Sequence, residues 1–195
     1  MPIVPAAAIY DLVASGGTLP GPDEGRLALA ASAGGSFAVG RVGAGCGATV
    51  GKWRGQEHAV SGGLGTASGR DGDVVVGALA VVNAIGDVIG ADGVIVAGST
   101  APEGTPGFAD PLPFEEGAHT TLVVVATNGR LSKIDCRLAA ESAHHGMVRA
   151  LHPSHTRHDG DIAFAAATGQ VGVHLDRLRV LVEDVTAEAI RSAVS

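Results

Sequence analysis

The chain has 195 residues, 46% of them apolar and only 3% aromatic, so we expect a single domain over residues 1–195 with a core of Val, Ala, Leu and Ile. Its net charge is −7 and it has no basic run mixed with aromatic residues, which argues against a nucleic-acid partner. The longest apolar run, 74–82, is too short to span a bilayer, and the first residues have no basic leader. We therefore expect a cytoplasmic protein without a membrane partner, in which Cys46 and Cys136 are packed, reduced thiols.

In the first half of the chain, glycine-rich loops alternate with short apolar segments. Alternation, apolar runs and turn residues predict a helix over 26–33, strands over 36–42 and 73–82, and a hairpin with arms 88–89 and 94–96. The second strand ends at Asn83, whose amide is either a turn residue or a hydrogen-bond donor to an oxyanion.

The glycine-rich stretch 43–53 resembles a phosphate-binding loop only superficially. A P-loop needs glycine where this chain has Cys46, and a hydroxyl residue where it has Trp53. We therefore expect no nucleotide and no other cofactor. Lys52, one of two lysines in the chain, is then either a solvated loop charge or a functional group.

The most informative stretch is the junction 117–128. A loop rich in proline and glycine, residues 99–118, leads into Thr120, Thr121 and an apolar run with the β-branched residues 123–125. The run predicts a strand covered on both faces. A hydroxyl residue at such a boundary is either an ordinary strand residue or the new N-terminus of a self-cleaved chain. An N-terminal Thr combines a nucleophilic hydroxyl and a basic α-amine on one residue.

The remainder of the chain predicts two helices and one more strand. Ser132 and Asp135 form a capping box for a helix reaching about residue 151, whose apolar side would be lined by Ile134, Leu138, Met147, Val148 and Leu151. The segment 175–182 is apolar without a clear period, and a short helix capped by Thr186 is expected to follow it. Five histidines between residues 144 and 158 form a loose cluster, but their spacing does not predict a metal site.

Two carboxylates, Asp159 and Asp161, flank Gly160 immediately before the predicted strand 162–167. An Asp-Gly turn is the simpler interpretation. The functional interpretation is a pair that orients an amine through charge-assisted hydrogen bonds.

Five segments together resemble one family, the self-processing L-aminopeptidase/D-esterase (DmpA-like) family, which includes β-peptidyl aminopeptidases and nylon-oligomer hydrolases. These segments are 2–11 (PIVPAAAIYD), 43–53 (GAGCGATVGKW), 81–87 (VVNAIGD), 120–128 (TTLVVVATN) and 155–161 (HTRHDGD). The resemblance implies a four-layer α/β/β/α fold, a homo-oligomer, and self-cleavage between His119 and Thr120 into subunits 1–119 and 120–195.

The resemblance also implies a role for each matching residue. Thr120 would be the nucleophile, Asn83 would bind the oxyanion, Lys52 would help to activate the nucleophile, and Tyr10 would line the substrate pocket. Asp159 and Asp161 would form the charge network around the nucleophile. The substrate would be a small peptide, or an amino-acid amide or ester, with a free amino end.

Two departures from the family pattern bear on these expectations. His119 replaces the usual Asn or Gly before the cut, and the family's long N-terminal section is expected to be missing. The alternatives are therefore a truncated non-catalytic remnant or assembly module, and an acyltransferase of the ornithine acetyltransferase type.

Overall fold

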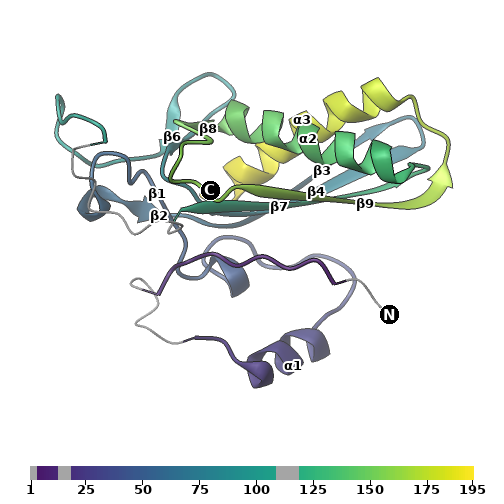
Figure 1. Cartoon of the computed structure of the whole chain (residues 1–195), viewed down its shortest axis with the longest axis horizontal. Helices are drawn as coiled ribbons and strands as arrows, with labels where there is room; N and C mark the ends of the chain where they lie inside the picture. The colour runs from purple at the N-terminus through teal and green to yellow at the C-terminus, as the bar shows by residue number, and fades with distance from the viewer. Residues whose placement is uncertain (1–3, 13–18, 109–118) are drawn as a thin grey trace.

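The largest sheet has four strands in the order β3-β4-β7-β9 (Figure 1). The structure is a computed structural model that describes residues 4–12, 19–108 and 119–195. Its strands are β1 (Thr49–Val50), β2 (Val60–Ser61), β3 (Gly63–Asp71), β4 (Val74–Asn83), β5 (Asp87–Ile89), β6 (Ile95–Ala97), β7 (Thr120–Gly129), β8 (Leu151–His152) and β9 (Ile162–Val171). Its helices are α1 (Pro22–Ala30), α2 (Lys133–Ala150) and α3 (Leu175–Ser192), with 3-10 turns η1 (Gly43–Gly45) and η2 (Gln56–His58).

Strand pairing in this sheet is antiparallel except at one edge. β3 and β4 form a hairpin that turns at Gly72, where φ is +61°. β4 pairs with β7, with Asn83 opposite Thr120, and β7 pairs in parallel with β9. The parallel pair needs a crossover, which α2 provides. The predicted strand 73–82 and the predicted hairpin around Gly90 are confirmed as β4 and as β5 with β6.

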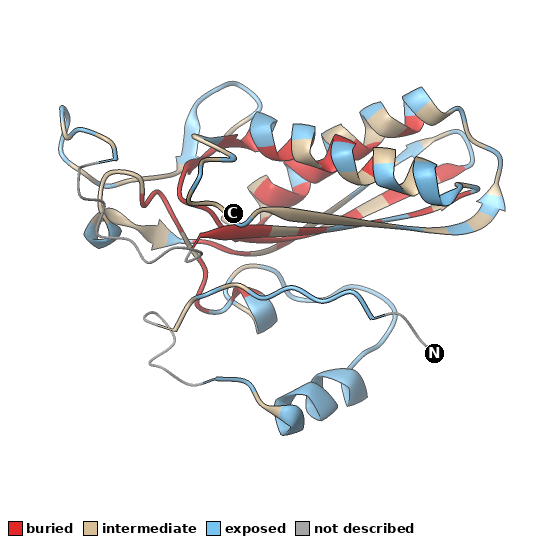
Figure 2. Ribbon diagram, viewed as in Figure 1, coloured by how far each residue is buried: buried red, intermediate tan, exposed pale blue. Residues whose placement is uncertain are grey.

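Helices α2 and α3 cover one face of this sheet and bury its core (Figure 2). The fully buried apolar side chains come from both layers and include Val76, Val82, Val123, Met147, Val182 and Ile190. Small residues allow the layers to approach closely. A Cβ at Gly65 of β3 would lie 2.1 Å from the Ala189 carbonyl oxygen of α3. Glycine is therefore required at that contact.

The opposite face of the sheet is less well covered. We predicted that β7 is buried on both faces, and this is wrong for the described residues, because burial alternates and Val124 is 44% exposed. Beside Val124 lies a shallow apolar depression lined by Phe37, Leu64, Leu79 and Ala126, among others. Helix α1 lies on this side of the molecule (Figure 1), but none of its residues is buried. In the part of the chain that the structure describes, the four-stranded sheet thus has a buried helical layer on one face only.

Several local predictions were also wrong. Residues 36–42 form only a bridge from Gly40 to Leu64, and Cys46 is exposed rather than packed. Segment 175–182 is the first half of α3, a single helix that runs through the buried Thr186. α2 has the predicted capping box at Ser132. Of the residues predicted for its apolar side, Met147 and Leu151 are buried, whereas Ile134 and Val148 are exposed. Its buried face consists of smaller residues and one methionine, namely Ala139, Ser142, Ala143, Gly146, Met147 and Ala150.

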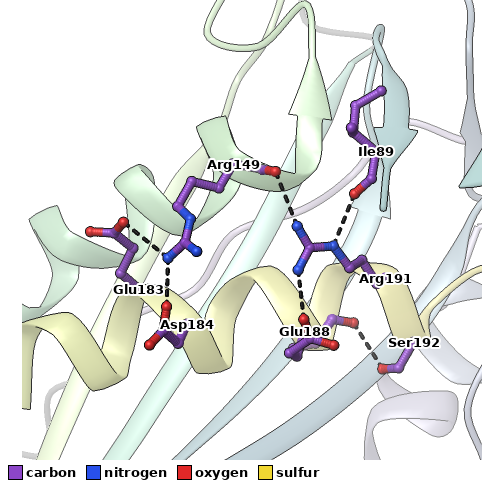
Figure 3. A network of polar contacts seen from close by, with 8 residues as sticks. Ile89, Arg149, Glu183, Asp184, Glu188, Arg191 and Ser192 are labelled. Carbon is purple, nitrogen blue, oxygen red and sulfur yellow. Dashed lines mark hydrogen bonds and ion pairs between the residues drawn. The ribbon is translucent and has the colours of Figure 1, made fainter. Parts of the chain in front are cut away.

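Arginines join the ends of the helices to the small sheet β6-β5-β8 (Figure 3). Arg149 of α2 contacts Glu183 at 3.1 Å and Asp184 at 2.5 Å on α3. Arg191 of α3 donates to the carbonyl oxygens of Ile89 and Arg149. This network fixes the helical layer relative to the segment that follows β4. No helix formed by the described part of the chain combines the length and apolarity needed to cross a membrane.

Candidate active site

The His119–Thr120 junction lies at the beginning of β7, between β4 and β9, and it is buried. His119 is 1% exposed and Thr120 is 5% exposed. Residues 109–118 of the preceding loop lie outside the described residues. Because Thr120 is directly opposite Asn83 in an antiparallel pair, these two side chains stand on the same face of the sheet.

The segment Asp159–Asp161 runs alongside the junction on the other side. His119 bridges Asp159 in parallel, and the Gly160 amide donates to the His119 carbonyl oxygen at 2.6 Å. One residue further on, the Thr121 amide donates to Oδ1 of Asp161 at 2.7 Å. The predicted carboxylate pair therefore lies beside the junction, and its backbone and side chains fix the position of that junction.

Lys52 reaches the junction from the glycine-rich loop. Gly51, at φ +75°, and Lys52 donate their backbone amides to Gly86 and Ile85, just after β4. This clamp directs the lysine side chain inward, where Nζ donates to Oδ1 of Asn83 at 2.9 Å and to its carbonyl oxygen at 3.1 Å. Lys52 is 1% exposed, so of the two alternatives the solvated loop charge is wrong.

Burial changes the acid–base properties of this lysine. Removal from water lowers the pKa of Lys52 to about 7, and the charge of nearby Asp159 only partly opposes this shift. Water solvates an ammonium better than the buried site does, so the neutral amine is favoured. An amine with a pKa near 7 is able to accept a proton at neutral pH.

The other ionisable groups of the site are shifted as well. Burial, together with the charges of Lys52 and His158, lowers the pKa of His119 to about 4, so this imidazole is neutral at pH 7. Burial and the neighbouring Asp161 raise the pKa of Asp159 above its ordinary value. Asp159 is nevertheless well bonded, because it accepts from the Ile85 amide and from the amide and hydroxyl of Thr156.

Tyr10 joins the site through its backbone. The side-chain amide of Asn83 donates to the Tyr10 carbonyl oxygen at 3.3 Å, and the tyrosine is 39% exposed. The structure therefore brings all six of the predicted residues Tyr10, Lys52, Asn83, Thr120, Asp159 and Asp161 into one region. Among the described residues, no three histidine, cysteine or carboxylate side chains converge in a group that could hold a metal ion.

Two further residues support the aspartate pair and were not predicted. Thr156 bonds Asp159 as described, and Nδ1 of His155 lies 2.8 Å from Oδ2 of Asp161. The Thr-x-x-Asp spacing from 156 to 159 is a local signal for the first contact. The second contact depends on the left-handed backbone of His155, at φ +53°, which the sequence does not indicate.

Replacing His155 by Asn should lower stability most at mildly acidic pH. The hydrogen bond to Asp161 raises the pKa of His155, so its stabilising contribution is complete below about pH 6.5 and is lost as the pH rises through the folded pKa. We expect a loss of about 1 kcal/mol at pH 6, which lowers the melting temperature by ~2–4 °C. The control is His145→Asn on the exposed side of α2. A loss of stability in His155→Asn that grows toward pH 9 would contradict the assignment.

The site thus consists of the Thr120 hydroxyl and the His119–Thr120 peptide bond, buried beside a lysine, an asparagine and two aspartates. All 195 residues match the model of Peptidase family S58, and the chain belongs to this family. The resemblance to this family that was predicted from the sequence is thereby confirmed.

The relatives found by sequence are aminopeptidases and oligomer hydrolases. The chain is 41% identical over 189 residues to an uncharacterized aminopeptidase of Mycobacterium tuberculosis (strain H37Rv), covering 89% of this chain and 53% of that protein. It is 34% identical over 181 residues to the 6-aminohexanoate-oligomer endohydrolase of Kocuria sp., covering 87% and 51%. The chain thus spans about half the length of the curated relatives it matches.

Solved structures agree with this relationship. The L-aminopeptidase D-Ala-esterase/amidase of Ochrobactrum anthropi, described as a variant of the Ntn hydrolase fold, aligns with a TM-score of 0.65 at 25% identity. It covers 88% of this chain, which in turn spans 48% of that structure. A Burkholderia sp. beta-aminopeptidase aligns with a TM-score of 0.68 at 24% identity, covering 91% and 52%, and supports the fold alone.

Proposed function

We propose that this protein is a self-processing N-terminal-nucleophile aminopeptidase or amidase, and that Thr120 is its nucleophile. The observation that carries this proposal is the buried His119–Thr120 peptide, bonded through its carbonyl to Gly160 and flanked by Lys52 and Asn83. Strand pairing alone does not require a buried lysine with a pKa near 7 beside Thr120, whereas a nucleophilic hydroxyl requires a nearby base.

Processing would begin with attack by the Thr120 hydroxyl on the carbonyl carbon of His119. The new Oγ1–C bond forms while the hydroxyl proton passes to a base, for which neutral Lys52 is the candidate. The peptide C–N bond then breaks as the Thr120 nitrogen takes up a proton, which leaves an ester. Water hydrolyses the ester and releases a His119 carboxylate and an N-terminal Thr120 with a free hydroxyl.

The processed enzyme would use the same hydroxyl on an external substrate. The freed α-amine of Thr120 has an ordinary pKa of roughly 7.7–8.0, so it is able to accept the hydroxyl proton. Asn83 is positioned opposite Thr120 to contribute to oxyanion binding. Asp159 and Asp161 supply negative charge beside the new amine, and Tyr10 contributes to the pocket wall. The substrate class is an amide or ester next to a free amino end.

We further propose that the uncovered face of the sheet packs against a second sheet, which completes a four-layer α/β/β/α arrangement in an oligomeric assembly. The support is the apolar character of that face at Leu79, Val124 and Ala126, together with the fold shared with the Ntn hydrolase relative. Apolar sheet faces are normally buried against another layer.

A first experiment is to follow the purified protein by mass spectrometry and then assay it. Processing yields two pieces, 1–119 and 120–195, and the processed protein hydrolyses amino-acid amides, β-peptides or 6-aminohexanoate oligomers. Acetyl transfer from acetylornithine serves as the negative control for substrate class, since activity there would indicate an acyltransferase. A chain that stays intact and inactive would instead identify a non-catalytic assembly module.

A further inference from the structure

The Gly160 backbone amide lies at the carbonyl group that self-cleavage would attack. Its nitrogen is 2.6 Å from the His119 carbonyl oxygen, which is short for an N–H donor to a carbonyl. The contact continues the parallel β7–β9 pairing beyond its last regular pair through the His119–Asp159 bridge. Strand geometry, rather than a flexible side chain, therefore aims this donor at the scissile carbonyl.

The same residue leaves space for the attacking hydroxyl. A Cβ at Gly160 would lie 2.8 Å from Oγ1 of Thr120 and 3.7 Å from the His119 carbonyl oxygen. A side chain at position 160 would therefore crowd the hydroxyl that must move toward the carbonyl carbon. The donor N–H belongs to Gly160, and the His119 carbonyl oxygen and the Thr120 hydroxyl both lie next to that residue.

We propose that the Gly160 N–H is the oxyanion donor of the self-cleavage step, an inference that rests on the proposed function. When Oγ1 of Thr120 bonds to the His119 carbon, the carbonyl oxygen takes up the negative charge. A donor already fixed at that oxygen stabilises this charge without any rearrangement. The side-chain amide of Asn83 donates to the Tyr10 carbonyl in the uncut chain. We therefore assign oxyanion binding during self-cleavage to Gly160, and oxyanion binding during hydrolysis of an external substrate to Asn83.

The test replaces the Gly160 residue by glycolic acid in the full chain, which converts the backbone N–H to an ester oxygen and adds no side chain. Loss of one oxyanion donor typically costs about 10²–10³-fold in rate, and we expect the rate of cleavage before Thr120 to fall by that factor. The matched control is the same replacement at Gly62, whose amide donates to the Ala48 carbonyl at 2.8 Å.

An ordinary structural hydrogen bond would behave differently from an oxyanion donor. If both esters slow cleavage equally, or if the Gly160 ester cleaves at the normal rate, the inference is overturned. If the unsubstituted chain is never cleaved, the proposed function itself fails, and the two failures are thus distinguishable.

A second measurement does not depend on the cleavage rate. The uncut Thr120→Ala chain, carrying a carbon-13 label at the His119 carbonyl, reports the hydrogen bond through the infrared frequency of that group. The ester at position 160 should raise this frequency, whereas the ester at position 62 should not. An unchanged frequency with the Gly160 ester would show that the amide does not polarise the scissile carbonyl.

Discussion

Thr120→Ala should leave the chain intact and eliminate hydrolysis, with activity reduced at least ~10⁴-fold. The substitution removes the only atom of Thr120 that is able to attack the His119 carbonyl, while the buried position keeps its strand pairing with Asn83. Mass spectrometry measures cleavage, and release of amine from an amino-acid amide measures hydrolysis.

Two controls accompany this variant. Thr120→Ser keeps a hydroxyl and should still be cleaved, and Thr121→Val alters the adjacent buried threonine but keeps its volume. Cleavage that persists in Thr120→Ala would assign the nucleophile to another residue. Loss of cleavage in Thr121→Val alone would indicate that packing, not the Thr120 hydroxyl, controls the reaction.

Lys52→Met should slow self-cleavage by about 100-fold or more and remove its dependence on pH near neutrality. The α-amine of Thr120 does not exist before the cut, so it cannot act as the base in this step, whereas Lys52 is already in place. Burial lowers the pKa of Lys52 to about 7, so the amine is neutral above that pH and charged below it. Cleavage in the unsubstituted chain should therefore rise about tenfold per pH unit below pH 7 and level off above it.

The chain contains its own matched control for this experiment. Lys133 is the other lysine, and it is exposed at the start of α2, so Lys133→Met should leave the cleavage profile unchanged. A cleavage rate that declines above pH 7 would show that the charged ammonium is the active form. In that case Lys52 would stabilise negative charge and would not accept the proton.

The sequence predicted the segments that have a strong local pattern. β4 and β7 are β-branched runs bounded by polar residues, and the capping box at Ser132 begins α2 as expected. The first half of α3 was missed, although the buried residues of this helix, among them Leu178, Val182, Val185, Ala189 and Ile190, recur at helical spacing. The buried face of α2 was predicted only in part, at Met147, because most of that face consists of small residues in close contact with α3. A Cβ at Gly146 would lie 2.5 Å from the Glu183 carbonyl oxygen. A pattern of hydrophobic residues does not show that close contact between two helices requires small side chains.

The candidate site was predicted through its family resemblance more than through local pattern. Nothing near Lys52 in the sequence shows that it is buried, because its burial depends on backbone bonds to Ile85 and Gly86, more than thirty residues away. The contact between Asp161 and His155 is made from a left-handed backbone at His155, which no local pattern in the sequence indicates. These are long-range or conformational facts, and only the folded chain contains them.

The pairing of β4 with β7 determines what would happen to the molecule after a cut before Thr120. β4 belongs to the piece 1–119 and β7 to the piece 120–195, and their ladder extends from Val76 opposite Thr127 to Asn83 opposite Thr120. The two polypeptides would consequently co-migrate on a sizing column and come apart only in denaturant. Each polypeptide produced alone would lack some of the reactive groups, because Lys52 and Asn83 lie on one and Thr120, Asp159 and Asp161 on the other. Activity would return only when the two are refolded together.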